Sequence, residues 1–154
     1  MLKNIILITL LIFIMSCGYE PIYSKKNMEN SNTFSITELN FIGDRVINIK
    51  IKEKLSLFVG DKKERKYKLK INSKFLKTTI SKNLKGDPSM FNLYTEVIVQ
   101  VQKKDGMNKQ EIFKQNFKYN NNQDKFELKN NERQIRKNMA EIITKDIIYK
   151  LSSY

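Results

Sequence analysis

The sequence predicts an α+β domain: a four-stranded, mostly antiparallel sheet with two α-helices packed on one face, in the order β-α-β-β-β-α. Four segments alternate apolar and polar side chains, as strands with one buried face do. Two segments place apolar side chains three and four residues apart, as amphipathic helices do. The domain is predicted over residues 34–154, after an N-terminal leader and a polar tether.

The first strand is predicted over residues 34–43, FSITELNFIG, with an irregularity late in the segment. Gly43 and Asp44 then supply a turn and a helix N-cap. Residues 45–59 are predicted as a helix, because apolar residues recur there at helical spacing and a glycine follows. Its isoleucines also alternate as in a strand, so a strand remains the alternative. The helical set is Ile47, Ile51, Leu55 and Phe58.

Three more strands are predicted over residues 66–76, 93–102 and 111–119, each with one apolar face. Asp105-Gly106, between the last two, is a typical hairpin turn. The predicted inward residues are Tyr67, Leu69, Ile71 and Phe75, then Thr95, Val97, Val99 and Val101, then Phe113, Phe117 and Tyr119. These last aromatic residues could stack nucleic-acid bases, but their alternation indicates a core face, and no nucleic-acid partner is expected.

A second helix is predicted from Asn131 to Leu151, after a loop over residues 120–131. Its apolar residues form one stripe, with basic residues largely off it. The stripe consists of Ile135, Met139, Ile142, Ile143, Ile147 and Leu151. With both helices on one face, the other face of the sheet is expected to carry Tyr94, Ile98 and Ile112 among polar neighbours such as Glu96, Gln100 and Lys114.

The composition excludes most enzyme chemistries. The chain has no histidine and one cysteine, which removes His-based triads, imidazole metal sites, CxxC pairs and an intramolecular disulfide. No glycine-rich phosphate loop or serine elbow is present. Four acids near turns are interpreted as solvated loop residues: Asp44, Asp61, Glu64 and Asp87. We therefore expect a protein that is not an enzyme and has no cofactor or metal.

The N-terminus predicts export. Residues 1–16 carry Lys3 and then an apolar run that is shorter than the roughly 20 residues needed to cross a bilayer, as in a secretory signal. The only cysteine, Cys17, follows directly, and residues 17–33 form a polar tether. A small buried thiol in an ordinary secreted leader is the alternative for Cys17.

The positive charge is concentrated in one segment. The chain has a formal charge of +13, and residues 62–85 hold ten basic residues and one acid, a local charge of +9. Alternate residues of a strand lie ~6.6 Å apart on one face, so Lys66, Lys68, Lys70 and Lys74 are expected to form a row that suits an anionic ligand. Alternatively, as lysines on an exposed or edge strand, they only block edge-to-edge aggregation. The candidate binding residues are Lys66, Lys68, Lys70, Lys74 and Lys77.

Two segments resemble the lipopolysaccharide-assembly lipoproteins of the outer membrane, the LptE family. Cys17 to Tyr23, CGYEPIY, is similar to the lipidated opening of that family, and Asn131 to Leu151 is similar to its closing helix. The resemblance implies a signal peptide over residues 1–16, an acylated Cys17 and an LptE-like domain over residues 34–154. It also implies a lipid-anchored protein on the periplasmic side of the outer membrane, where the lysines would bind lipopolysaccharide.

The same resemblance implies a partner, an outer-membrane β-barrel lipopolysaccharide-assembly protein that this chain helps to assemble and plugs. A different class of function remains open, a structural envelope lipoprotein that binds a periplasmic polyanion or peptidoglycan and has no transport role. The two differ in whether the chain stays with a barrel when both are extracted from the membrane.

We predict that Cys17 is the acylated N-terminus of the mature protein. Intact-mass analysis of membrane-extracted protein should give residues 17–154 plus lipid, because two or three acyl chains are needed for stable anchoring. Cys17→Ala should leave the domain folded but release it from the membrane. An unmodified thiol at Cys17 would contradict the prediction.

Overall fold

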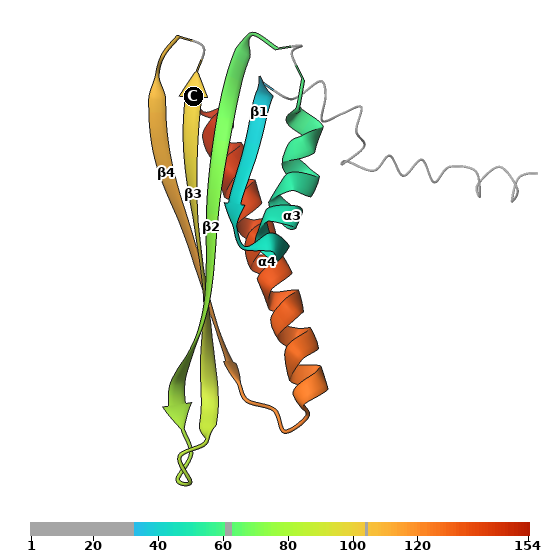
Figure 1. The fold of residues 1–154 in the computed structure, drawn as a ribbon, viewed down its shortest axis with the longest axis vertical. Coiled ribbons are helices and arrows are strands. Elements are labelled where there is room, and N and C mark those ends of the chain that lie inside the picture. Colours follow the sequence, from blue (N-terminus) through green and yellow to red (C-terminus); the bar gives the residue numbers. More distant parts are fainter. Residues whose placement is uncertain (1–32, 61–62, 104) are drawn as a thin grey trace, which may run out of the picture. The chain divides into compact units, whose positions relative to one another are not determined.

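The computed structural model describes residues 33–60, 63–103 and 105–154. The predicted signal peptide, Cys17 and nearly all of the tether lie outside these residues. The described chain forms four strands, two α-helices and a short 3-10 helix (Figure 1). The elements are β1 (Phe34–Gly43), α3 (Arg45–Leu55), η1 (Ser56–Phe58), β2 (Arg65–Lys82), β3 (Pro88–Lys103), β4 (Asn108–Asn120) and α4 (Lys125–Ser152).

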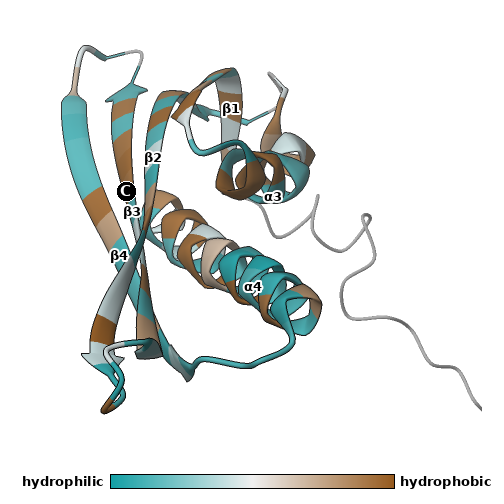
Figure 2. Cartoon of the chain, turned by 60° about the horizontal axis from the view of Figure 1, so that its bottom comes forward, coloured by the Kyte–Doolittle hydropathy of each residue, from teal (hydrophilic) through white to brown (hydrophobic). Residues whose placement is uncertain are grey.

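The strands form one sheet in the order β1-β2-β3-β4. The pair β1–β2 is parallel, and the pairs β2–β3 and β3–β4 are antiparallel. Both helices lie on the same face of the sheet (Figures 1 and 2). The predicted fold class, an α+β sheet with two helices on one face, is therefore confirmed. We call the opposite face of the sheet the open face.

The core lies between the sheet and the helices. Its larger part joins β1, β2, β3, α3 and the C-terminal half of α4, and it includes Ile47, Tyr67 and Ile143, none of them exposed. A smaller part lies toward the β2–β3 turn and joins β3, β4 and the N-terminal half of α4. Its buried residues are Phe91, Leu93, Tyr119, Leu128, Ile135 and Met139.

Helix α3 is confirmed and its strand alternative is wrong. Ile47 and Ile51 are fully buried while Ile49 is 46% exposed, which fits a helical period and not an alternating one. The Asp44 side chain accepts hydrogen bonds from the backbone N–H groups of Val46 and Ile47, at 3.0 and 3.1 Å, and so caps the helix as predicted. The helix ends at Leu55, and η1 replaces its predicted last turn.

Helix α4 begins at Lys125, six residues before the predicted start at Asn131, so the loop prediction for this segment is wrong. The carboxylate of Asp124 accepts hydrogen bonds from the N–H groups of Phe126 and Glu127 and caps the helix. Leu128 is buried and extends the apolar stripe by about two turns before Ile135. The segment looked like a loop because, apart from Leu128 and the exposed Phe126, its residues are polar.

The strands also differ from the prediction in their lengths and in one residue's environment. Strand β2 continues to Lys82, and strand β3 begins at Pro88. Both are longer than predicted, because the two strands pair through backbone hydrogen bonds beyond the residues whose side chains alternate between apolar and polar. The irregularity of β1 lies early, between Ile36 and Glu38. Phe117, predicted to be in the core, is 45% exposed, because edge strand β4 is only partly covered by α4.

The turn from β1 into α3 lies directly against β2. Gly43 has φ +99°, and a Cβ atom there would lie 1.9 Å from the carbonyl oxygen of Ser73. That oxygen accepts a hydrogen bond from the N–H of Asp44 at 3.0 Å, and the Ser73 hydroxyl donates to the Asn48 side chain at 2.7 Å. Only glycine therefore fits the start of the crossover from β1 to β2.

We predict that Gly43→Ala destabilises the domain more than Gly86→Ala, as measured by chemical denaturation. Both glycines have positive φ, which costs an alanine about 1–2 kcal/mol. Gly86 has open space around its Cβ position, whereas at Gly43 the backbone of β2 must also move, which adds about 1–3 kcal/mol. Equal losses would show that the close approach to Ser73 does not matter.

A polar cluster joins β2 to α4 on the helix-facing side of the sheet. The Lys77 ammonium lies 2.5 Å from a carboxylate oxygen of Glu132 and 4.0 Å from the ring centroid of Phe91. The Tyr119 hydroxyl donates a hydrogen bond to the same carboxylate at 2.5 Å. Burial raises the pKa of Glu132, but the hydrogen bonds from Lys77 and Tyr119 outweigh it and hold that pKa below 4.5. Burial, followed by the bond to Glu132, raises the pKa of Tyr119.

We predict that Lys77→Gln lowers the free energy of unfolding at pH 7 by about 1 kcal/mol, because it removes an ion pair and a cation–π contact. Lys74→Gln, a matched change on the open face, should cost less than about 0.5 kcal/mol. Because folding lowers the pKa of Glu132, its carboxylate stabilises the fold at any pH above the ordinary pKa of a glutamate. This stabilisation is lost as the pH falls through the pKa of Glu132 in the folded protein. The difference between parent and Lys77→Gln should therefore shrink below about pH 4.5. A difference that does not change with pH would contradict this role of Glu132.

Candidate functional site

The lysines of β2 lie on the open face as the alternation predicted. Lys68, Lys70 and Lys74 are exposed, and Lys66 at the start of the row is partly buried. The intervening residues Tyr67, Leu69 and Ile71 are buried in the core. The strand thus separates a cationic row from an apolar one. The expectation that these lysines bind lipopolysaccharide stays a prediction.

Lys77, the fifth candidate, is not part of this row. It sits at an odd position of β2, on the face that the helices cover, and its ammonium is paired with Glu132. These contacts hold β2 against α4. The Lys77 side chain is 35% exposed to solvent. The row itself therefore consists of Lys66, Lys68, Lys70 and Lys74.

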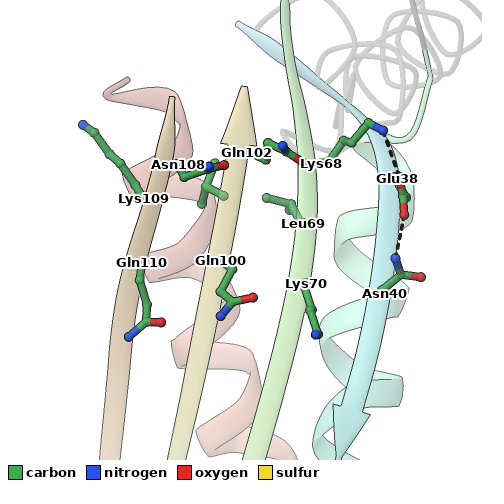
Figure 3. A pocket seen from close by; sticks show the side chains of 11 residues that line it. Glu38, Asn40, Lys68, Leu69, Lys70, Gln100, Gln102, Asn108, Lys109 and Gln110 are labelled. Carbon is green, nitrogen blue, oxygen red and sulfur yellow. Dashed lines mark hydrogen bonds and ion pairs between the residues drawn. The ribbon is translucent and has the colours of Figure 1, made fainter. Parts of the chain in front are cut away.

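A polar hollow of about 570 Å³ lies on the open face across all four strands (Figure 3). The pairing of the strands builds its floor from two adjacent rows of side chains. One row runs Glu38, Lys68, Gln102, Asn108, and the next runs Asn40, Lys70, Gln100, Gln110. Of these residues, only Lys68, Lys70 and Gln100 were predicted to lie on this face. The amides could also have been found from the sequence, because they occupy alternate, outward positions of the segments that form β3 and β4.

An apolar row follows the polar hollow toward the β2–β3 turn. Ile98 of β3 pairs with Ile112 of β4, and on the other side Asn72 separates Ile98 from Ile42 of β1. Ile42 and Ile112 are each 52% exposed. One row further on, Lys74, Glu96 and Lys114 pair across the strands. The open face thus alternates polar and apolar bands, and the expected surface positions of Ile98 and Ile112 are confirmed.

The acids of the open face are each held by a neighbouring cation or hydroxyl. The Lys68 ammonium lies 3.2 Å from Glu38, and its hydrogen bond lowers the pKa of that carboxyl. The Tyr94 hydroxyl donates to Glu96 at 2.7 Å and lowers the pKa of Glu96, with Lys114 at 3.4 Å adding to the effect. Lys70, in contrast, has no ion-pair partner in the part of the chain that the structure describes. Its charge is available to an anion in the polar hollow.

The arrangement suits binding by hydrogen bonds and charge. Among the residues that the structure describes, no three His, Cys, Asp or Glu side chains are grouped as metal ligands would be. The same residues include no helix that is both long enough and apolar enough to cross a membrane. The chemistry that remains is that of lysine ammonium groups and side-chain amides around a concave surface.

The fold occurs in solved structures of bacterial proteins, although no protein-family model and no curated protein matches the chain. The rare lipoprotein B of Shewanella oneidensis is similar with a TM-score of 0.55 at 13% identity, over 74% of this chain and 96% of that one. A minor lipoprotein of Acinetobacter baumannii gives 0.54 at 11% identity, over 76% and 91%. An uncharacterized lipoprotein B of Nitrosomonas europaea gives 0.56 at 14%, over 79% and 86%. At these identities the likeness shows that the chain shares the fold of these proteins.

Proposed function

We propose that this chain is a lipid-anchored protein of the bacterial envelope that binds lipopolysaccharide on the open face of its sheet. It acts without catalysis, as a subunit of an outer-membrane translocon. The resemblance of the CGYEPIY segment to the start of LptE-family lipoproteins supports the anchor at Cys17. The fold, which several proteins named as lipoproteins share, supports the same assignment.

The observation that carries the proposal is the banding of the open face. Lipopolysaccharide joins a phosphorylated sugar head to acyl chains, so a surface that binds it needs cationic and apolar regions next to each other. Lys68 and Lys70 lie in the polar hollow, and Ile98 of β3 and Ile112 of β4 lie in the outward row that follows the row of Lys70, about 7 Å along the sheet. A lysine row that only protected an edge would lie along an unpaired strand edge, but Lys68 and Lys70 lie where β2 is paired on both sides, and Lys66 lies where it is paired with β1. Only Lys74 lies beyond the last pair with β1, Gly43 with Ser73.

We predict that changing Lys66, Lys68, Lys70 and Lys74 together to Gln weakens lipopolysaccharide binding by tenfold or more and flattens its salt dependence. Each lysine near an anionic surface contributes about 1 kcal/mol, and salt screens this attraction. The matched control changes four exposed lysines of the helices to Gln: Lys52, Lys54, Lys125 and Lys129. Binding measured across a salt series should separate the two variants. An unaltered affinity and salt slope in the β2 variant would leave these lysines as solubilising residues only.

We further propose that the partner is an outer-membrane β-barrel, and we predict a stable one-to-one complex with it. Detergent extraction followed by affinity purification should recover the barrel with this chain. Depletion of this chain should leave the barrel misassembled and lipopolysaccharide retained inside the envelope. Normal barrel assembly and normal surface lipopolysaccharide after depletion would instead favour a structural lipoprotein that binds a polyanion or peptidoglycan.

A further inference from the structure

The floor of the polar hollow is built mainly from side-chain amides. Gln100 pairs with Gln110, and in the adjacent row Gln102 pairs with Asn108. All four belong to β3 and β4 and lie at outward, exposed positions (Figure 3). Two neighbouring strands thus present four amides as one patch beside the lysines of β2.

These four amides make no side-chain hydrogen bond within the described chain, unlike the fifth amide of the hollow. Asn40 donates to Glu38 at 2.8 Å and is held in place by it. Each free amide offers two N–H donors and one acceptor oxygen. A fully ionised anion accepts hydrogen bonds but donates none, so it would use the N–H groups of this surface and leave the carbonyl oxygens unused. A ligand with hydroxyl groups, which both donate and accept, would use all of it.

The cations are placed at one side of the amide patch. Lys70 continues the row of Gln100 and Gln110, and Lys68 continues the row of Gln102 and Asn108. Lys109 also borders the hollow, but its ammonium lies 4.0 Å from the ring centroid of Tyr154, and Figure 3 shows it pointing away from the floor. An anion over β2 would meet Lys70, which has no ion-pair partner in the described chain, and Lys68, which it would share with Glu38. Neutral hydroxyl groups are favoured over β3 and β4.

We propose that the polar hollow is a saccharide site, in which the amides of β3 and β4 bind sugar hydroxyls while Lys68 and Lys70 bind a phosphate on the same sugar. The inference rests on the proposed function and deepens it, because the sugar head group of lipopolysaccharide would be recognised by hydrogen bonds as well as by charge. The hollow, at about 570 Å³, lies within the usual range of ligand sites. The apolar row of Ile98 and Ile112 would then contact the acyl part.

The test uses the mature chain with Cys17→Ala, which has no acyl anchor and so needs no detergent that would dissolve a vesicle, and two probes. One probe is lipopolysaccharide from which all acyl chains have been removed, a phosphorylated oligosaccharide. The other is a phosphatidylglycerol vesicle, which supplies phosphate and acyl chains without an amino-sugar head. The amide variant combines Asn108→Ala and Gln110→Ala, and its matched control combines Asn116→Ala and Asn120→Ala, two exposed amides on the same face of β4 outside the hollow.

The amide variant should bind the oligosaccharide about tenfold more weakly, as expected for two lost hydrogen bonds, and should bind the vesicle as the parent does. The control variant should match the parent with both probes, and all variants should show the same thermal unfolding. A Lys68→Gln, Lys70→Gln variant should lose affinity for both probes. In nuclear magnetic resonance, the side-chain amide signals of Gln100 and Gln102 should move with the oligosaccharide but not with inorganic phosphate.

Two results would overturn the inference. One is an amide variant that binds the oligosaccharide as tightly as the control does, which would show that these amides are only solvated. The other is a parent chain that does not bind the oligosaccharide at all. Either result leaves the proposed function standing if intact lipopolysaccharide still binds in a lysine-dependent way. A chain that binds no intact lipopolysaccharide would contradict the proposed function itself.

Discussion

Burial on one side of the sheet is the constraint on which the rest of the structure depends. Both helices cover the same face, so in the regularly paired stretches of the strands alternate residues lie toward the helices and on the open face. The core side is filled by residues such as Tyr67 and Val97, which leaves the other side free to carry groups that have no role in stability. The open face can therefore carry lysines, amides and isoleucines in bands, because no helix of the described chain packs against it.

The sequence alone predicted the structural features that depend on residues close together in the chain. Alternation predicted the two faces of β2, and helical spacing predicted α3. Lys77 could have been assigned to the covered face on the same grounds, because it has the parity of Tyr67 and Phe75. The start of α4 was missed because the signal there is a single capping residue, Asp124, in a polar segment.

The polar hollow was beyond the reach of local pattern, because it depends on which residues of distant strands lie side by side. Asn40, Lys70, Gln100 and Gln110 form one row although sixty-nine positions separate the first from the last. That alignment is determined by the turn at Gly43, which brings β1 against β2, and by the two hairpins that follow. No segment of the sequence contains the row by itself, so only the assembled sheet reveals the amides as one surface.

Side chains along β2 point alternately to the two faces of the sheet, and this alternation limits which insertions and deletions the strand can accept. A single inserted or deleted residue in the middle of this strand would exchange its two faces beyond that point, placing ammonium groups under the helices and isoleucine in water. Substitutions at outward positions carry no such penalty, and bulges or turns can absorb length changes. We therefore expect chains with this fold to tolerate substitution at outward positions and to accommodate changes of length at the strand ends. This chain shares the fold with similar structures at 11–14% identity.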